Sequence, residues 1–573
     1  MHVRDRKSGF LCRGLCVGSL ALALIALGAG CGGGGDETDY EIDDDSITIN
    51  EERNWSDADS AYDWESPGTT ARLKLLVDDF NHGSMEVRIL DALGAVIFQE
   101  VYWTYDGWYY IDWEYSDVAY TDPGEAGLWT IELSYYEFTG EVTLVVESTD
   151  RPAAESAVQQ PALDSLLLDL TFGDYGRAAY APDRSGSRRI ARDSFGRLVT
   201  AGTTVTPEGM RRLTVWRRTV AGALDAGFGT GGVFVYDNAA LAASGGADVA
   251  VDASNRVLVA GWFGDDLHRT DAAVMRLTSG GALDTTFSGD GIVTFDDGED
   301  EVAAAVAVDG AGRVLLAGSA RTADNSAGYM FLARLTSAGA LDNTFATAGI
   351  YESTDTGDRG WDVAMASGNR PVVLGIRGGA MILWRFTDGG ALDATFGGDG
   401  IVTSGGAGEY RIGRGLCVHS DDTVKVAGFR IYEDGVDPTE MLVWAYQADG
   451  DPELTFSGDG LLEGRYLPGV AAATGVVVDG SGRLLVCGVT RSSGVAKTDS
   501  SATIWRFLAT GLSDPTLPGS GGTGMARIDP RPDDAGTLAG SLVLGAGGSA
   551  YVAGTAFDRT NGASDAIIWK LSP

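Results

Sequence analysis

The sequence has few of the residues on which most catalytic and metal-binding sites depend. Its 573 residues include only four histidines and five cysteines, and their spacing matches no zinc site. It contains no nucleophile elbow, phosphate-binding loop or dinucleotide-binding fingerprint. Cys417 and Cys487, the only cysteines beyond the N-terminal region, lie in apolar runs. We therefore expect free, buried thiols and no disulfide framework.

Basic residues are also scarce. Lysine and arginine number 42 against 81 aspartates and glutamates, which gives a net charge of −39. Nucleic-acid binding requires lysine and arginine to neutralise phosphates, so we expect no nucleic-acid partner. A strongly negative surface instead favours solubility outside the cell.

The N-terminus has the organisation of an export signal. Basic residues precede an apolar run over residues 15–27, which is too short to span a bilayer as a mature helix. We therefore predict a signal peptide over residues 1–30. The segment Leu27-Gly28-Ala29-Gly30-Cys31 resembles the bacterial lipobox. The resemblance implies that Cys31 is diacylated and becomes the mature N-terminus; the alternative is secretion without a lipid.

A short Gly-rich and acidic segment follows. We predict that residues 31–45 form a flexible tether, because such a composition cannot bury a core. Gly32, rather than an aspartate, follows Cys31. This resembles the lipoproteins that are exported to the outer membrane. We therefore expect a lipid anchor in the bacterial outer membrane or at the cell surface, with the membrane as a partner.

Residues 46–147 contain short runs that alternate between apolar and polar positions, with turn residues such as His82-Gly83-Ser84 and Thr139-Gly140 between them. This pattern is typical of a small β-sandwich, and residues 148–162 have the composition of a linker. The stretch 102–120 is rich in aromatic residues. They either pair across strands in a small core or form an exposed platform for a ligand. The platform residues would be Trp103, Trp108, Tyr110 and Trp113.

Internal repetition dominates residues 163–573. The phrase Leu-Asp-x-Thr-Phe-Gly-x-x-Gly occurs seven times, intact or degraded, at intervals of 51 to 61 residues. A strand that closes on Ala-Gly or a variant of it also occurs seven times. Each unit has room for four short strands. We therefore predict an all-β fold: a seven-bladed β-propeller of four-stranded blades over residues 163–573, preceded by the β-sandwich.

These units resemble the bacterial delta-60 repeat, a family of β-propellers without an assigned activity. The phrase from Leu392 to Val402 carries the resemblance in nearly intact form. Small residues suit a crowded axis, so we expect the Ala-rich first strand of each unit to be innermost. The chain would then end on a third strand. We expect residues 168–180 to supply the missing outer strand beside residues 566–572, which closes the ring.

A basic residue ends the third strand in six units, and an acid follows eight residues later in several. The basic residues are Arg217, Arg276, Arg334, Arg385, Arg506 and Lys570, and the acids are Asp225, Asp284, Asp342 and Asp393. Ala445 breaks the pattern. We interpret these residues as structural ion pairs. For the acidic run 296–301, calcium is an alternative to a solvated loop; no other metal and no cofactor is predicted.

These features favour a cell-surface, lipid-anchored binding or scaffold protein without catalytic activity, whose ligand is a carbohydrate or a protein. The alternative is a propeller enzyme, a hydrolase or lyase that acts on an exported polysaccharide-like substrate. A channel with two or more carboxylates and a tyrosine or histidine would favour the enzyme, whereas a smooth, alanine-lined channel would favour the binding protein.

Overall fold

The computed structural model describes residues 37–42, 46–66, 70–90, 96–103, 115–120, 127–149, 167–174, 176–180, 185–206, 210–238, 241–264, 270–296, 300–321, 328–405, 409–432, 440–464, 469–492, 500–518, 520, 523–528, 534–558 and 564–572. In these ranges nearly all regular structure is β-strand, and the helices are single 3-10 turns, η1 (Ser367–Asn369) and η3 (Ala546–Gly548). The fold is all-β, as predicted. No helix within these ranges is long and apolar enough to cross a membrane.

The described residues fall into two compact units, of which the first ends with Thr149 and the second begins with Leu167. The first unit is one antiparallel sheet with the strand order β1-β2-β6-β3-β4, and β5 pairs with β3. Its strands are β1 (Glu37–Ile42), β2 (Ser46–Ser66), β3 (Thr70–Leu90), β4 (Val96–Trp103), β5 (Tyr115–Tyr120) and β6 (Gly127–Thr149).

Three strands of this sheet are much longer than the sequence pattern predicted. The expected turns at Gly83 and Gly140 are wrong, because these residues lie inside β3 and β6. The pairing of β3 with β6 shifts register near His82, so the turn residues produce a local irregularity instead of a chain reversal. Every described strand here belongs to one hydrogen-bonded sheet, and the two-layered β-sandwich stays a prediction.

The second unit consists of four-stranded antiparallel sheets. The first sheet is β8 (Ser185–Arg192), β9 (Leu198–Val205), β10 (Arg211–Arg218) and β11 (Val233–Val235). The second is β12 (Ala243–Val251), β13 (Val257–Gly264), β14 (Thr270–Leu277) and β15 (Ile292–Phe295). The third is β16 (Asp300–Val308), β17 (Val314–Arg321), β18 (Gly328–Leu335) and β19 (Ile350–Glu352). The fourth is β20 (Arg359–Ala366), β21 (Arg370–Arg377), β22 (Ala380–Arg385) and β23 (Ile401–Ser404).

Three further sheets follow in the same order along the chain. The fifth is β24 (Glu409–Val418), β25 (Val424–Tyr432), β26 (Glu440–Tyr446) and β27 (Leu461–Gly464). The sixth is β28 (Gly469–Val478), β29 (Leu484–Ser492), β30 (Ser501–Phe507) and β31 (Met525–Ile528). The last is β32 (Asp534–Leu544), β33 (Ala550–Asp558), β34 (Ser564–Leu571) and β7 (Arg177–Tyr180).

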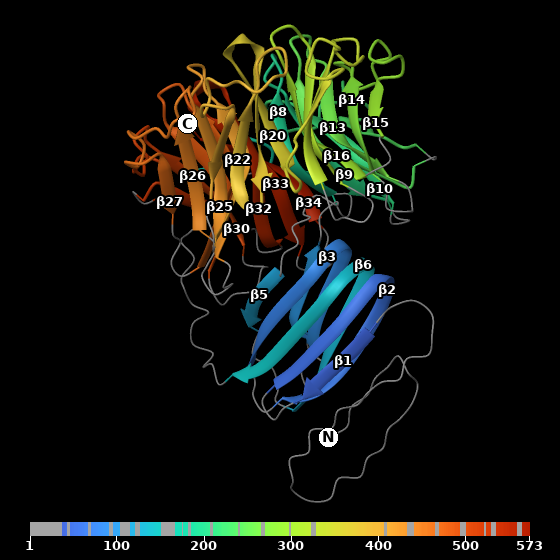
Figure 1. Cartoon of the computed structure of the whole chain (residues 1–573). Helices are drawn as coiled ribbons and strands as arrows, with labels where there is room; N and C mark the ends of the chain where they lie inside the picture. Colours follow the sequence, from blue (N-terminus) through green and yellow to red (C-terminus); the bar gives the residue numbers. More distant parts are fainter. Residues whose placement is uncertain are drawn as a thin grey trace, which may run out of the picture. The chain divides into compact units, whose positions relative to one another are not determined.

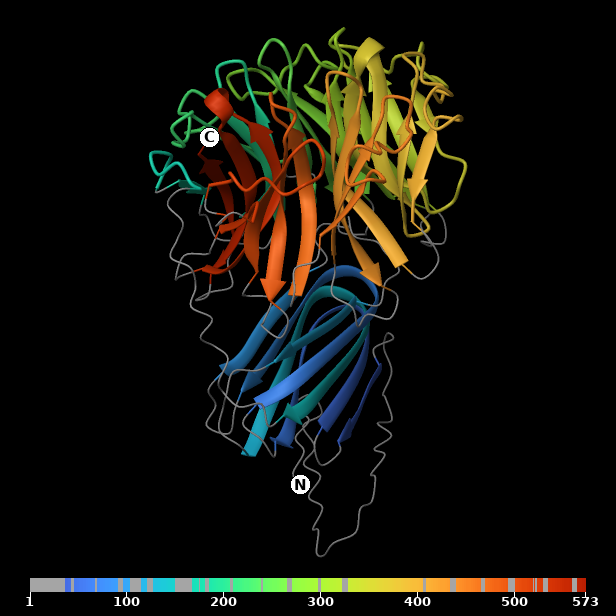
Figure 2. The ribbon, with the colours of Figure 1, turned by 90° about the vertical axis from the view of Figure 1, so that its left-hand side faces the viewer.

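The sheets pack side by side, as Figures 1 and 2 show. The first strand of each sheet contacts the first strand of the next, and β32 contacts β8. Apolar side chains fill the space between neighbouring sheets: Leu258 of β13 and Leu316 of β17, for example, belong to one buried cluster. This arrangement is a β-propeller with the first strands innermost.

Every innermost strand carries a β-bulge at the same position. The bulges lie between Ser187 and Arg189, Gly246 and Asp248, Ala303 and Ala305, Gly360 and Asp362, Gly413 and Gly415, Ala473 and Gly475, and Ala539 and Ser541. The glycine of the repeated Ala-Gly phrase faces the bulge. At Gly318 of β17, a Cβ would lie 2.0 Å from the carbonyl oxygen of Val302. The phrase therefore recurs because a side chain there would collide with the bulged strand.

The last sheet takes its outer strand from the other end of the propeller. β7 pairs with β34 from Ala566↔Tyr180 to Trp569↔Arg177, and Leu168 forms a bridge with Leu571. The expected pairing of residues 168–180 with residues 566–572 is confirmed. It covers the edge that β34 would otherwise expose to other strands.

Candidate functional site

Buried ion pairs recur at the end of the third strand. In five sheets an arginine there donates through Nε to a carboxylate eight residues later, at 2.8–2.9 Å. We call this carboxylate the connector acid, because it lies in the connection to the fourth strand. The pairs are Arg217–Asp225, Arg276–Asp284, Arg334–Asp342, Arg385–Asp393 and Arg506–Asp514. The predicted structural pairs are confirmed, and Asp514 joins them.

These arginines also reach the neighbouring sheet. The guanidinium of Arg276 lies 4.5 Å from the ring centre of Phe287 and donates to the carbonyl oxygen of Ser337, which follows β18 in the next sheet. Equivalent ring and carbonyl contacts are made by Arg217, Arg334 and Arg385. Removing one partner of a buried pair leaves an uncompensated charge, which typically costs about 3–5 kcal/mol.

A second arginine, which the sequence analysis missed, ends the turn between the first and second strands. We call it the turn arginine. An aspartate four residues earlier binds it at 2.6–2.7 Å in the pairs Arg197–Asp193, Arg256–Asp252, Arg313–Asp309 and Arg483–Asp479. In the fourth sheet Arg370 takes this place. All five turn arginines lie within 4.0 Å of the connector acid of their sheet. The recurring Asp-x-x-x-Arg spacing was the available signal.

The fifth sheet departs from this pattern at both arginine positions. Ala445 stands at the end of its third strand, β26, and Thr423 stands at the end of its turn. The cation comes instead from Lys425 in β25, which lies directly across from Ala445 and forms an ion pair with the connector acid Glu453. The break at Ala445 is thus compensated from the neighbouring strand.

The last sheet completes the pattern with residues from both ends of the propeller. Lys570 of β34 forms an ion pair with Asp169 at 2.7 Å. The hydrogen bond from Lys570 is the main cause that lowers the pKa of Asp169 to about 2. The pair therefore fastens the segment before β7 to the last strand.

Three charged side chains lie directly after bulges of the innermost strands. Arg189 of β8 donates to Oδ2 of Asp362 in β20 at 2.9 Å. Asp362 also accepts the backbone N–H of Leu416 in the fifth sheet at 3.0 Å, and Asp248 of β12 accepts that of Val306 in the third at 2.9 Å. Burial raises the pKa of Asp248 to about 6, opposed by Arg189 and reinforced by the nearby Asp362. The axis is therefore not smooth and alanine-lined.

A separate acidic group contains part of the predicted acidic run. Oxygen atoms of Asp271 in β14, Asp296 after β15 and Glu301 in β16 all lie within 4.8 Å of one another. Calcium takes about six to eight oxygen ligands, so these carboxylates would supply only part of its shell. The structure adds Asp271, which sequence spacing could not link to the run, and calcium binding stays a prediction.

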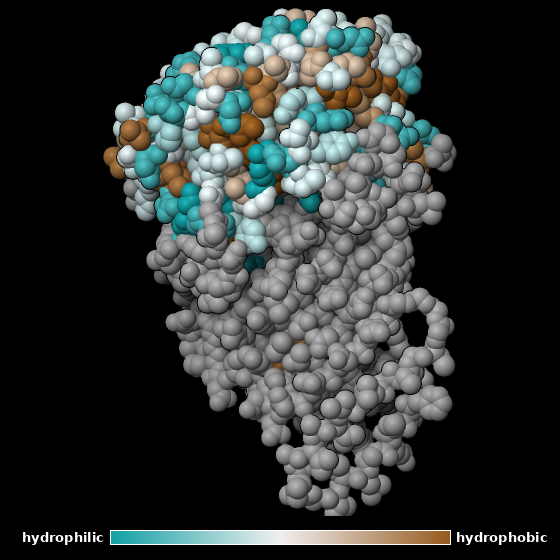
Figure 3. Space-filling model, viewed as in Figure 1, coloured by the Kyte–Doolittle hydropathy of each residue, from teal (hydrophilic) through white to brown (hydrophobic). Residues whose placement is uncertain are grey.

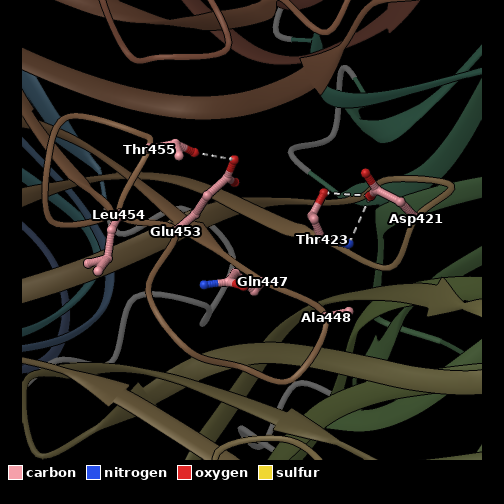
Figure 4. Close-up of a pocket in the computed structure, with 7 residues that line it drawn as sticks. All are labelled: Asp421, Thr423, Gln447, Ala448, Glu453, Leu454 and Thr455. Atoms are coloured by element: carbon pink, nitrogen blue, oxygen red, sulfur yellow. Dashed lines mark hydrogen bonds between the residues drawn. The ribbon is translucent and has the colours of Figure 1, made fainter.

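A pocket of about 480 Å³ lies on the fifth sheet. Its walls are formed by Asp421, Thr423, Gln447, Ala448, Glu453, Leu454 and Thr455. Figure 4 shows Asp421 and Thr423 on one side and the segment from Glu453 to Thr455 on the other. Although burial opposes it, hydrogen bonds from Thr423 and His419 lower the pKa of Asp421 to about 2. Asp421 is therefore a carboxylate at neutral pH.

The positions predicted for ligand binding and lipid attachment are not part of this geometry. The structure does not describe Cys31, Trp108, Tyr110 or Trp113. Trp103 is the last residue of β4, and its side chain is not described. Cys417 and Cys487 are free thiols, as expected; Cys487 is buried, whereas Cys417 is only partly buried. Burial is the main cause that raises the pKa of Cys487 to about 12, so this thiol is chemically inert at neutral pH.

Comparison with known families supports the repeat fold. Residues 253–287 and 312–345 match the family described as a domain of unknown function (DUF5122) beta-propeller. These segments contain the turn, second strand, third strand and connector of the second and third sheets. The chain therefore carries repeats of a propeller type whose function is unknown. No curated protein matches the sequence.

Solved structures of low similarity also match. A protein from Lactobacillus plantarum is 14% identical over 56% of this chain and 80% of its own length, with a TM-score of 0.34. A protein of unknown function from Dyadobacter fermentans is 10% identical over 69% and 98%, with a TM-score of 0.34. A polysaccharide lyase of family PL25, an ulvan lyase, is 9% identical over 68% and 95%, with a TM-score of 0.35. Similarity at this level says nothing about the activity of this chain.

The compensation in the fifth sheet predicts a rescue. Lys425→Leu should lower the free energy of unfolding by about 1–3 kcal/mol, less than for a fully buried pair because Glu453 is partly exposed. Adding Ala445→Arg should recover most of this loss, because it recreates the arrangement of five other sheets. Urea unfolding of the two variants and the parent checks this. A double variant no more stable than Lys425→Leu alone would contradict the compensation.

The buried acid at the axis predicts a pH dependence. Asp248 has a pKa of about 6 in the folded chain, against about 3.9 when unfolded. Its contribution to stability is fully present below about pH 4 and is lost as the pH rises through about 6. The loss amounts to about 3 kcal/mol. Asp248→Asn keeps an acceptor for Val306 and should flatten this part of the profile. Urea unfolding between pH 4 and 8 measures the free energy of unfolding, and Asp399→Asn is the control. Parallel pH profiles of the parent and Asp248→Asn would refute the assignment of this pH dependence to Asp248.

Proposed function

We propose that this chain is an exported, lipid-anchored binding or scaffold protein without catalytic activity, built on a seven-bladed β-propeller. The proposal rests on the repeated charged residues, which stabilise the fold. The third-strand arginines join neighbouring sheets, and Arg189 pairs with Asp362 at the axis. These groups serve the scaffold, so a ligand would be recognised by what differs between the blades.

The anchor and the N-terminal unit rest on the sequence. The basic and apolar residues before Cys31 support a lipoprotein signal peptide. The Gly-rich residues after Cys31 support a propeller held away from the outer membrane or cell surface, but residues 37–42 of the expected tether form β1, which pairs with β2 in the first sheet. The alternating patterns of residues 46–147 favour a β-sandwich, and the repeat phrases favour membership of the delta-60 repeat family.

The ligand we propose is a carbohydrate or a protein at the cell surface. The aromatic residues Trp103, Trp108, Tyr110 and Trp113 would offer a platform for it. On the face drawn in Figure 3, apolar side chains of the described propeller residues form small patches among hydrophilic ones. Such a surface favours a polar ligand over an extensive apolar interface. The net charge of −39 argues against nucleic acid.

The alternative is a hydrolase or lyase that acts on an exported polysaccharide-like substrate. Asp248 and Asp362 are its candidate carboxylates. Both are more than nine-tenths buried, and each accepts a backbone N–H from the next sheet. A general acid or base must reach the proton it transfers. This burial therefore favours the binding protein.

The anchor predicts a change in location. Cys31→Ser should move the protein from the membrane fraction to the soluble fraction of the cell envelope, because the acylated thiol is lost. Immunoblotting of fractionated cells measures this, together with incorporation of labelled palmitate. Cys487→Ser is the control, since this thiol is buried in the propeller. Retention of Cys31→Ser in the membrane would refute the lipid anchor.

The binding function predicts retention without turnover. The Cys31→Ser chain should bind a cell-surface glycan or protein on an array while leaving it intact, with calcium or with a chelator present. Product analysis by mass spectrometry measures turnover. Calcium-dependent binding that Asp271→Asn abolishes would place the ion at the acidic group of Asp271, Asp296 and Glu301. Cleavage of the bound polymer, lost in Asp248→Asn, would establish the enzyme instead.

A further inference from the structure

The fifth and last sheets lack the turn arginine that the five other sheets place beside the connector acid; Ser549 stands at this position in the last sheet, and the fifth sheet has a pocket there. In the third sheet the turn ends in Arg313, directly before β17, and Nη1 of Arg313 lies 4.0 Å from Asp342. In the fifth sheet the corresponding turn ends in Thr423, directly before β25. The side chain of Thr423 is too short to reach the position that the guanidinium of Arg313 occupies in the third sheet.

The connector of the fifth sheet keeps the groups that receive arginine elsewhere. In the second sheet Asp284 and Thr286 accept from the third-strand arginine, Arg276, at 2.8 and 3.0 Å, and Asp284 also lies 3.7 Å from Nη1 of the turn arginine, Arg256. Glu453 and Thr455 stand at the same two connector positions. Their side chains lie 3.2 Å apart, with the Thr455 hydroxyl on Oε1 of Glu453.

The pocket described above occupies this place. Glu453 and Thr455 line it from the connector, and Thr423 and Asp421 line it from the turn (Figure 4). Lys425 binds Oε2 of Glu453 and so compensates one of the two carboxylates. The carboxylate of Asp421 lies 3.0 Å from Nδ1 of His419 and is largely exposed. The pocket therefore contains two carboxylates, of Glu453 and Asp421, and only one lysine to balance their charge.

We infer that this pocket binds the guanidinium group of a ligand, in place of the arginine that the turn lacks. A guanidinium presents five N–H donors in a plane, which suits carboxylates and hydroxyls on opposite walls. Leu454, which is 66% exposed, offers an apolar surface to the methylene stem. In five other sheets of this chain the turn arginine places its guanidinium 3.2–4.0 Å from the connector acid. The inference concerns a different site from the aromatic platform and does not depend on the lipid anchor.

Guanidinium groups occur in two forms that this pocket would accept. One is the arginine side chain of a polypeptide, and the other is free arginine or a related small molecule. Both present the same planar donors, and they differ in the charged groups around the α-carbon. Probes of both kinds therefore distinguish the source.

The test uses the full chain with Cys31→Ser and follows binding by saturation-transfer NMR. The probes are methylguanidinium, L-arginine, an end-blocked Gly-Arg-Gly peptide and the matching Gly-Lys-Gly peptide. Methylguanidinium and at least one arginine probe should bind. Thr423→Arg, which supplies the missing guanidinium, should weaken this binding about tenfold or more. Asp421→Asn should weaken it about threefold or more without touching the Lys425–Glu453 pair.

Two controls separate specific binding from general attraction to an acidic protein. Asp290→Asn removes one exposed carboxylate from a turn of the second sheet and should leave binding unchanged. Thermal unfolding of each variant reports whether the propeller is intact. A peptide that binds as tightly as free arginine identifies a polypeptide source, and a peptide that does not bind identifies a small molecule. Equal affinity for the lysine peptide, unchanged affinity in Thr423→Arg, or no binding of any guanidinium probe would overturn the inference.

Discussion

A buried guanidinium that touches two sheets at once is the interaction on which the propeller depends. Apolar packing between sheets is strong but has no direction, so it tolerates sliding. The arginine at the end of the third strand adds direction, because its donors meet a carboxylate of one sheet and a carbonyl oxygen of the next. The phenylalanine of the repeat phrase lies against the guanidinium and shields it from water. The spacing that recurs in the units of this chain therefore reflects one contact, which each of these arginines makes between two sheets.

The repeats made most of the propeller predictable. The number of strands in each unit followed from the spacing of the two phrases, and the closing pair between residues 168–180 and 566–572 followed from placing the Ala-rich strands innermost. The contact between Arg189 and Asp362 could not be predicted, because they lie 173 residues apart and meet only when the sheets are arranged in space. The N-terminal unit was less predictable for a local reason. Glycines at 83 and 140 look like turns in sequence, yet long strands absorb them through shifts of register.

The fifth unit, which departs from the repeated pattern, says more about function than the five units that keep it. In five sheets the connector acid is surrounded by two arginines of the chain itself, so nothing is left for a ligand. In the fifth sheet Lys425 preserves the structural charge balance, while Thr423 opens a polar pocket. Sequence reasoning registered the first change at Ala445 and missed the second, because the turn arginine had not been recognised as part of the repeat.

The strand shared between the two ends of the propeller also dictates an order of assembly. Residues 177–180 have no partner strand until residues 564–571 are present, although nearly the whole propeller lies between them. Sheets whose strands are neighbours in sequence can form early, whereas this contact must bring distant segments together and is intrinsically slow. An intermediate in which the early sheets are formed would therefore carry an open edge. If the chain is exported as we propose, the ring can close only after residues 564–571 have also crossed the membrane.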